Sequence, residues 1–242
     1  RGLTLRGVAG ASVVVKEGYG VLTGGQGEEQ WAGAGDDFEW MYSPAIGTSA
    51  AMDYLGRTGL DALKGADILK TAADSYSSTV EYAATPIARS LKGMAQVILK
   101  GLGTRVLYTS QGGYDTHANQ VPVQTPLLDD LSKGIGDFFA DLEEHDASDN
   151  VMMLVFTEFG RRVKDNGSGS DHGSGGGCYL IGHPVKGGMY GEYPSLREAD
   201  QLDGDLHFNV DYRSVYSTIV EKWMGLDAKS TVGGNYEHLD FV

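Results

Sequence analysis

Three short glycine-rich segments of the sequence carry residue types that bind divalent metal ions. They read Asp115-Thr-His117, Glu158-Phe-Gly-Arg161 and Asp171-His-Gly173. Carboxylate oxygen and imidazole nitrogen are ligands for zinc, manganese and similar ions, and glycine lets the backbone turn sharply enough to aim such ligands at one point. The pattern predicts a site for one or two metal ions, with the candidate ligands Asp115, His117, Glu158, Asp171 and His172.

The same residue types also have a purely structural use. Asp and His in glycine-rich loops often cap turns through hydrogen bonds to nearby backbone N–H groups. Arg161 and Arg162 offer a planar guanidinium that could clamp a tetrahedral oxyanion, and the alternative is an ion pair between one of them and Glu158. At the level of the residues, the metal site and the structural turn both stay open.

The remaining histidines have weaker functional signals. His145 follows two glutamates at the end of a predicted helix, where an imidazole suits the helix dipole and solvent, so we expect a structural role. His183 precedes a proline in a turn and is the reserve candidate for a ligand.

Helices and strands with clear periodicity surround these segments. Apolar residues at three- and four-residue steps behind Pro86 predict a helix that ends near Gly101, and a second apolar stripe predicts an amphipathic helix over 127–142. A short β-rich run lies at 104–109, and the continuous apolar run 151–156 is typical of a strand buried in a parallel sheet. The order strand, helix, strand predicts a βαβ unit.

The loops that carry the candidate ligands follow those two strands. In open α/β sheets, ligands collect in the crevice at the carboxyl ends of the strands, so we expect the loops 111–120 and 157–177 to meet there. A third short strand is predicted at 178–181, and a helix over 211–225 with Asp211 as its N-cap. Residues 1–45 are predicted to be an irregular, glycine-rich segment with one short strand at 13–15.

Size and composition limit the class of protein. A chain of 242 residues suits one α/β domain, and 36 glycines indicate many tight turns. The formal charge is −14 and no basic stripe is present, which argues against a nucleic-acid partner. The longest apolar run is far shorter than the roughly 20 residues of a membrane-spanning helix. Cys178 is the only cysteine, so no intrachain disulfide forms, and its apolar neighbours predict a small core residue.

Several motifs in a fixed order resemble the DUF1501 family, a group of mostly exported bacterial proteins placed in the alkaline phosphatase/sulfatase superfamily. The resemblance spans most of the chain. It is carried by Gly112-Gly-Tyr-Asp-Thr-His-Ala-Asn-Gln120, Phe156-Thr-Glu-Phe-Gly-Arg-Arg162, Asn166 through Asp171-His172-Gly173, Val185-Lys-Gly-Gly188 with Tyr190-Gly191, and Val210-Asp-Tyr-Arg213.

The resemblance implies a fold, a site and a reaction. The implied fold is the alkaline-phosphatase-like three-layer α/β/α sandwich with a mostly parallel sheet, here without its amino-terminal strand or strands. The implied reaction is metal-dependent hydrolysis of phosphate or sulfate esters, small or polysaccharide. Zinc is the first choice of metal, with manganese or calcium as alternatives. Asp115 and His117 would serve one metal position, Glu158, Asp171 and His172 would complete the site, and Arg161 would hold the nonbridging oxygens.

Family members also carry an export signal and a nucleophile region upstream of the residues matched here. The resemblance therefore implies a periplasmic or extracellular protein whose nucleophile is supplied by a segment outside this chain, with an upstream fragment of the same protein as a partner. A homo-oligomer stays open. The alternatives are a noncatalytic exported protein, structural or binding, that keeps the superfamily fold, and a carbohydrate- or surface-binding module suggested by the aromatic residues Trp31 and Trp40.

Overall fold

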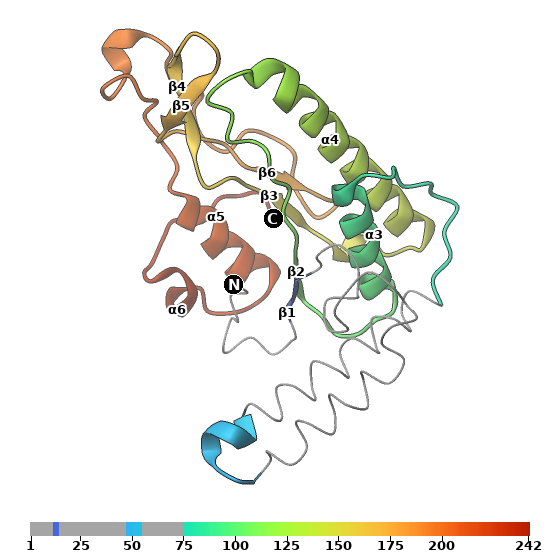
Figure 1. Ribbon diagram of the computed structural model, residues 1–242. Coiled ribbons are helices and arrows are strands. Elements are labelled where there is room, and N and C mark those ends of the chain that lie inside the picture. The colour runs from blue at the N-terminus through green and yellow to red at the C-terminus, as the bar shows by residue number, and fades with distance from the viewer. Residues whose placement is uncertain (1–11, 15–46, 55–74) are drawn as a thin grey trace. The chain divides into compact units, whose positions relative to one another are not determined.

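The computed structural model of the chain describes residues 12–14, 47–54 and 75–242 (Figure 1). The chain divides into two compact units. Unit 1 comprises residues 1–111 and 130–145, and unit 2 comprises residues 112–129 and 146–242. The aromatic residues Trp31 and Trp40, and nearly all of the segment 1–45, lie outside the described residues. The single domain expected from chain length stays a prediction.

Helix α3 of unit 1 spans Pro86–Leu99, as its periodicity predicts. The side chain of Thr85 caps its first turn by accepting a hydrogen bond from the N–H of Ala88, and Pro86 occupies a first-turn position where no N–H is needed. The helix ends at Lys100, and Gly101 then adopts φ +66°, a left-handed conformation that glycine reaches without strain.

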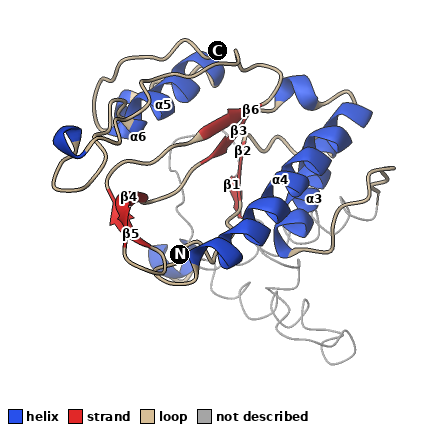
Figure 2. Cartoon of the chain, turned by 90° about the horizontal axis from the view of Figure 1, so that it is seen from above, coloured by secondary structure: helices blue, strands red, loops and turns tan. Residues whose placement is uncertain are grey.

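Helix α4 spans Gln120–Glu144 and contributes residues to both units. It begins earlier than the apolar stripe indicates and includes Pro126. Figure 2 shows α3 running alongside the part of α4 that belongs to unit 1. A Cβ at Gly134 would lie 3.2 Å from Leu91 and 3.6 Å from the Cα of Ala88, so glycine permits the close approach of the two helices. Buried apolar side chains of α3 and α4 form the core there: Ile87, Leu91, Met94, Val97, Phe138 and Leu142.

Two glycines on α4 give a matched test of this packing. Gly136 has no atom within 4 Å of an added Cβ, so Gly136→Ala is expected to stabilise the protein by about 0.5–1 kcal/mol through helix propensity alone. Gly134→Ala gains the same propensity, but Leu91 must move to admit the methyl group, so its net gain should be smaller or negative. Urea unfolding of both variants measures the difference. A larger stabilisation from Gly134→Ala would contradict the packing argument.

The described strands pair in three separate two-stranded sheets, which contradicts the mostly parallel, three-layer sandwich. Strand β1, Ser12–Val14, pairs in parallel with β2, Val106–Tyr108. Strand β3, Met153–Val155, pairs antiparallel with β6, Tyr179–Ile181. The run 151–156 is thus a strand as expected, but β3 is only half-buried and its partner is antiparallel. The βαβ unit is wrong for the same reason: β2 pairs with β1, and β3 pairs with β6.

Strands β4 and β5 form an antiparallel pair in a region that the sequence indicates is loop. Strand β4 spans Gly160–Asp165, and β5 spans Ser170–Gly173. Gly160 lies opposite Gly173 and Arg161 opposite His172, with an irregularity before Asp165. The pair displays candidate site residues from both strands on one short ladder.

The carboxy-terminal part of unit 2 is helical. Helix α5, Tyr212–Thr218, begins at Asp211, whose carboxylate accepts a hydrogen bond from the N–H of Arg213, so the predicted N-cap is confirmed. A π-helical turn, Ile219–Trp223, follows, and then helix α6, Lys229–Val232. Short 3-10 helices lie at Ser148–Asn150 and Glu198–Asp200. Phe241 is fully buried, whereas Cys178 is exposed just before β6 and is not the core residue expected.

Candidate metal centre

The loop before α4 is fixed through one backbone oxygen. The carbonyl oxygen of Tyr114 accepts hydrogen bonds from the N–H of Thr116 at 2.9 Å, the side chain of Gln124 at 3.1 Å and the guanidinium of Arg161 at 2.5 Å. Gln124 also donates to the hydroxyl of Thr116 at 2.8 Å. The first turns of α4 and the start of β4 therefore hold the loop that carries the first two candidate ligands.

The turn between β4 and β5 holds the same loop from the other side. The Asn166 side chain accepts from the N–H of Gly169 at 2.9 Å and donates to the carbonyl of His117 at 3.0 Å and to Asp171 at 3.2 Å. A Cβ at Gly169 would lie 2.7 Å from the carbonyl oxygen of Thr116 and 2.8 Å from the carbonyl carbon of His117. Only glycine permits this approach of the two backbones without a shift.

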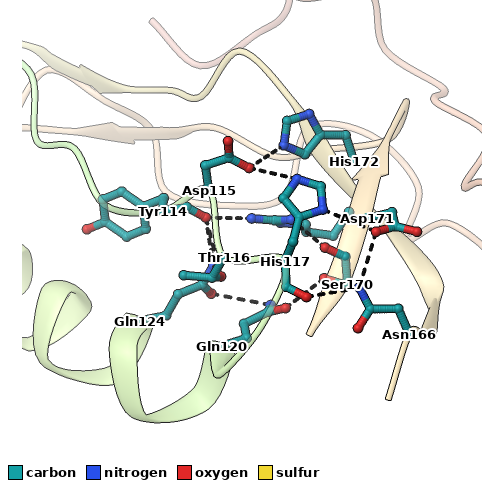
Figure 3. A network of polar contacts seen from close by, with 11 residues as sticks. Tyr114, Asp115, Thr116, His117, Gln120, Gln124, Asn166, Ser170, Asp171 and His172 are labelled. Carbon is teal, nitrogen blue, oxygen red and sulfur yellow. Dashed lines mark hydrogen bonds and ion pairs between the residues drawn. The ribbon is translucent and has the colours of Figure 1, made fainter. Parts of the chain in front are cut away.

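Three side chains from these two segments direct ligand atoms at one another (Figure 3). Oδ1 of Asp115 lies 2.6 Å from Nε2 of His172 and 3.0 Å from Nε2 of His117, and one ligand atom from each of the three residues lies within 4.8 Å of the other two. Ligands at 2.0–2.1 Å from a tetrahedral ion are about 3.3 Å apart. Small rotations of the side chains therefore bring one carboxylate oxygen and two imidazole nitrogens to the spacing of a zinc site.

Each imidazole is oriented by a second contact. Nδ1 of His117 lies 3.1 Å from Oδ1 of Asp171 and Nε2 lies 3.0 Å from Oδ1 of Asp115, so an ion bound to Nε2 would leave the proton on Nδ1, where it faces Asp171. The ring of His172 stacks on that of Phe159, with centroids 3.8 Å apart and an interplanar angle of 12°. A carboxylate that orients a ligating imidazole is the usual companion of a metal site.

The carboxylates of the site are ionised at neutral pH. The hydrogen bond with His172 holds the pKa of Asp115 below its usual range, and those from His117 and Asn166 lower the pKa of Asp171. The side chains of Asp115, His117 and His172 are between 44% and 63% exposed. An ion bound to them would keep an open face toward solvent or substrate, which is the arrangement of catalytic sites and not of closed structural ones.

The structure brings together three of the five predicted ligands and separates the other two from that set. Asp115, His117 and His172 form the group, and Asp171 contacts it through the outer nitrogen of His117. Glu158 is exposed and does not belong to the group of ligand atoms found among the described residues.

The predicted oxyanion clamp, Arg161, has other contacts. Its guanidinium donates to the carbonyl oxygens of Tyr114 and Ser170, both at 2.5 Å, and lies over the ring of Phe159. These contacts give Arg161 a role in holding the site together, and its contact with a substrate stays a prediction.

Sequence reasoning missed the residues that support the ligands. Asn166 and Phe159 lie inside the motifs that carry the family resemblance, so their position within those motifs was an available signal. Gln124 gave no signal, because a glutamine in the first turns of an amphipathic helix is an ordinary exposed residue.

A second group of metal-ligand types lies in unit 1 and is already bound by protein atoms. Asp141, Glu144 and His145 bring one ligand atom each within 4.8 Å. However, both oxygens of Glu144 accept from the N–H of Thr79, and both ring nitrogens of His145 lie against backbone carbonyl oxygens. This group is a hydrogen-bond network of the protein itself.

Comparison with known proteins identifies the family. The family model described as "Protein of unknown function (DUF1501)" matches residues 49–237. The chain therefore belongs to the DUF1501 family, as its motifs indicate. No curated protein and no solved structure matches the chain.

Among the described residues, none of the helices combines the length and the apolar character that crossing a membrane requires.

Proposed function

We propose that the chain binds a divalent metal ion, zinc first and manganese or calcium as alternatives, and takes part in metal-dependent hydrolysis of phosphate or sulfate esters. The observation that carries the metal site is the meeting of Asp115, His117 and His172, which come from segments more than fifty residues apart. Two imidazole nitrogens that lie beside one carboxylate oxygen form a donor set that suits zinc.

The residues of this chain have different roles in the proposed site. Asp115, His117 and His172 hold the ion, Asp171 keeps the proton of His117 on Nδ1, and Phe159 fixes the plane of His172. A bound ion at an open position would polarise an ester oxygen and offset the negative charge that develops on it. The attacking serine or threonine is assigned to a segment outside this chain, in keeping with the proposed relation to the alkaline phosphatase/sulfatase superfamily, which also motivates a periplasmic or extracellular location.

Metal content is the first test. Elemental analysis of the purified protein, with intact mass measured on the same sample, should find close to one equivalent of zinc or a similar ion, and calorimetric titration of the metal-free protein should give a saturable site. A screen of phosphate and sulfate monoesters then tests hydrolysis. Absence of metal binding would overturn the proposal; metal binding without hydrolysis would favour the noncatalytic binding protein.

The orienting role of Asp171 can be tested separately. Asp171→Asn is expected to weaken zinc binding by about 10- to 100-fold, the usual effect of losing an outer-shell partner of a ligating histidine. In the zinc-loaded protein, nitrogen NMR of the His117 ring should show a hydrogen bond from Nδ1–H to Asp171 in the wild type, and this hydrogen bond should weaken in the variant. Asp203 is an exposed aspartate of the same unit, so Asp203→Asn is the control. This variant should change neither the zinc affinity nor the NMR signal of the His117 ring.

Affinity alone would not separate orientation from direct ligation. If Asp171 were itself a ligand, as the resemblance implies, Asp171→Asn would weaken zinc binding with no change in the hydrogen bonding of the His117 Nδ1–H.

A further inference from the structure

A segment that precedes α3 lies against the end of α4, both within unit 1. We call residues 75–82 the strap. The hydroxyls of Tyr76 and Tyr82 both donate to Oδ2 of Asp141, at 2.6 and 2.8 Å. Asp141 is fully buried, so these two tyrosines replace the water that its carboxylate loses on folding. Glu144 accepts two further hydrogen bonds from the N–H of Thr79.

His145 completes this contact with both of its ring nitrogens. Nδ1 lies 2.8 Å from the carbonyl oxygen of Asp141, and Nε2 lies 3.0 Å from the carbonyl oxygen of Ser77 in the strap. A carbonyl oxygen only accepts hydrogen bonds, so both nitrogens must carry a proton. A neutral imidazole has only one N–H and cannot make both bonds. The geometry therefore requires the imidazolium form.

We propose that His145 is a pH-sensitive clasp that fastens Ser77 of the strap to α4 when its ring is protonated and gives up this contact, which loosens the strap, when the ring is neutral. In the neutral ring, Nδ1 keeps its proton for the carbonyl one helical turn back, and the lone pair of Nε2 then faces the carbonyl oxygen of Ser77. Two acceptors at 3.0 Å repel each other, so the strap loses its contact with the ring.

The charged groups around the ring favour the cation. Oδ1 of Asp141 is buried, has no hydrogen-bond partner among the residues that the structure describes, and lies 3.3 Å from Nδ1 of His145, so the imidazolium is its compensating charge. Glu144 adds a second carboxylate on α4. On the strap side, the centroid of the Tyr76 ring lies 6.2 Å from that of the His145 ring. From α3, the ammonium of Lys92 lies over the rings of Tyr76 and Tyr82 and is an opposing charge.

The sign of the pH dependence follows from these contacts. Hydrogen bonding to the carbonyl of Asp141, and then to that of Ser77, raises the pKa of His145 above its ordinary value of 6.5. A raised pKa in the folded state gives a stabilisation that is complete below 6.5 and is lost as the pH rises through the folded value. The clasp therefore opens as the pH rises above 6.5 and through the raised pKa of His145.

Hydrogen exchange tests the clasp in the whole chain. After correction for intrinsic exchange rates, amides of the strap should lose about tenfold in protection between pH 6 and pH 9, the factor expected for one lost hydrogen bond to a charged group. His145→Gln should show the low protection at every pH. His207→Gln, an exposed histidine of unit 2, is the control and should behave as wild type.

If His145→Gln does not fold, an NMR titration of the His145 ring in the wild-type protein tests the proposal by measuring its pKa directly. A pKa at or below 6.5, or strap protection in the wild type that does not change with pH, would overturn the proposal. Coincidence of the ring titration with the loss of strap protection would support it.

Discussion

Asp115→Asn is expected to reduce the affinity for zinc by more than about 100-fold. Loss of an outer-shell partner costs about 10- to 100-fold, and Asp115 supplies one carboxylate oxygen that approaches both imidazole nitrogens, at 2.6 and 3.0 Å. The amide of asparagine keeps the shape of the side chain but loses its charge, so the effect isolates the carboxylate. Competition with a chromophoric chelator at fixed pH measures the affinity.

Two further variants make this result specific. Asp203→Asn should bind zinc as the wild type does, because Asp203 is an exposed aspartate outside the group of candidate ligands. Glu158→Gln should also leave the affinity close to that of the wild type. Equal losses from Glu158→Gln and Asp115→Asn would show that the ion is held by a different ligand set.

Gly160→Ala is expected to destabilise the β4–β5 pair by about 3 kcal/mol or more. A Cβ at Gly160 would lie 1.8 Å from the carbonyl oxygen of Gly175 and 2.4 Å from its carbon. These are backbone atoms, so the clash cannot be relieved by rotating a side chain, and the cost should reach or exceed the upper end of the overpacking range. Hydrogen exchange of residues 158–176 measures the local effect directly.

Gly177 provides the matched control. An added Cβ there meets nothing within 4 Å, so Gly177→Ala should be neutral or slightly stabilising, since alanine restricts the unfolded chain. Because Phe159 and Arg161 flank Gly160, zinc affinity should fall together with the stability of the pair. Unchanged protection in Gly160→Ala would contradict the close approach of the two backbones.

The helices could be predicted from sequence because their signals are local. Pro86, the apolar steps behind it and Gly101 define α3 within a single window, and the same holds for the stripe of α4. Strand pairing is not local. The run 151–156 indicates a strand, but nothing in it selects β6 as an antiparallel partner. The family resemblance implied one mostly parallel sheet, whereas the described strands form three two-stranded sheets, of which two are antiparallel.

The residue types of the candidate site could be predicted from the sequence. Which of these residues would ligate an ion and which would orient the ligands could not. Carboxylates and imidazoles in glycine-rich loops indicate the site, and three of them meet. Which of the neighbours Asp171 and His172 faces Asp115 depends on the register of β4 and β5, where Arg161 lies opposite His172. That register is set when β4 and β5 pair in the folded protein, and it cannot be read from the sequence of either strand alone.

The carbonyl oxygen of Tyr114, where the ligand loop, α4 and β4 converge, belongs to the main chain and not to a side chain. Any amino acid at position 114 presents the same oxygen, so a substitution there keeps this anchor and removes only what the side chain adds, such as the hydrogen bond from the Tyr114 hydroxyl to the carbonyl oxygen of Leu127. Loss of the Gln124 side chain leaves the contact from Arg161 in place, and loss of Arg161 leaves that from Gln124.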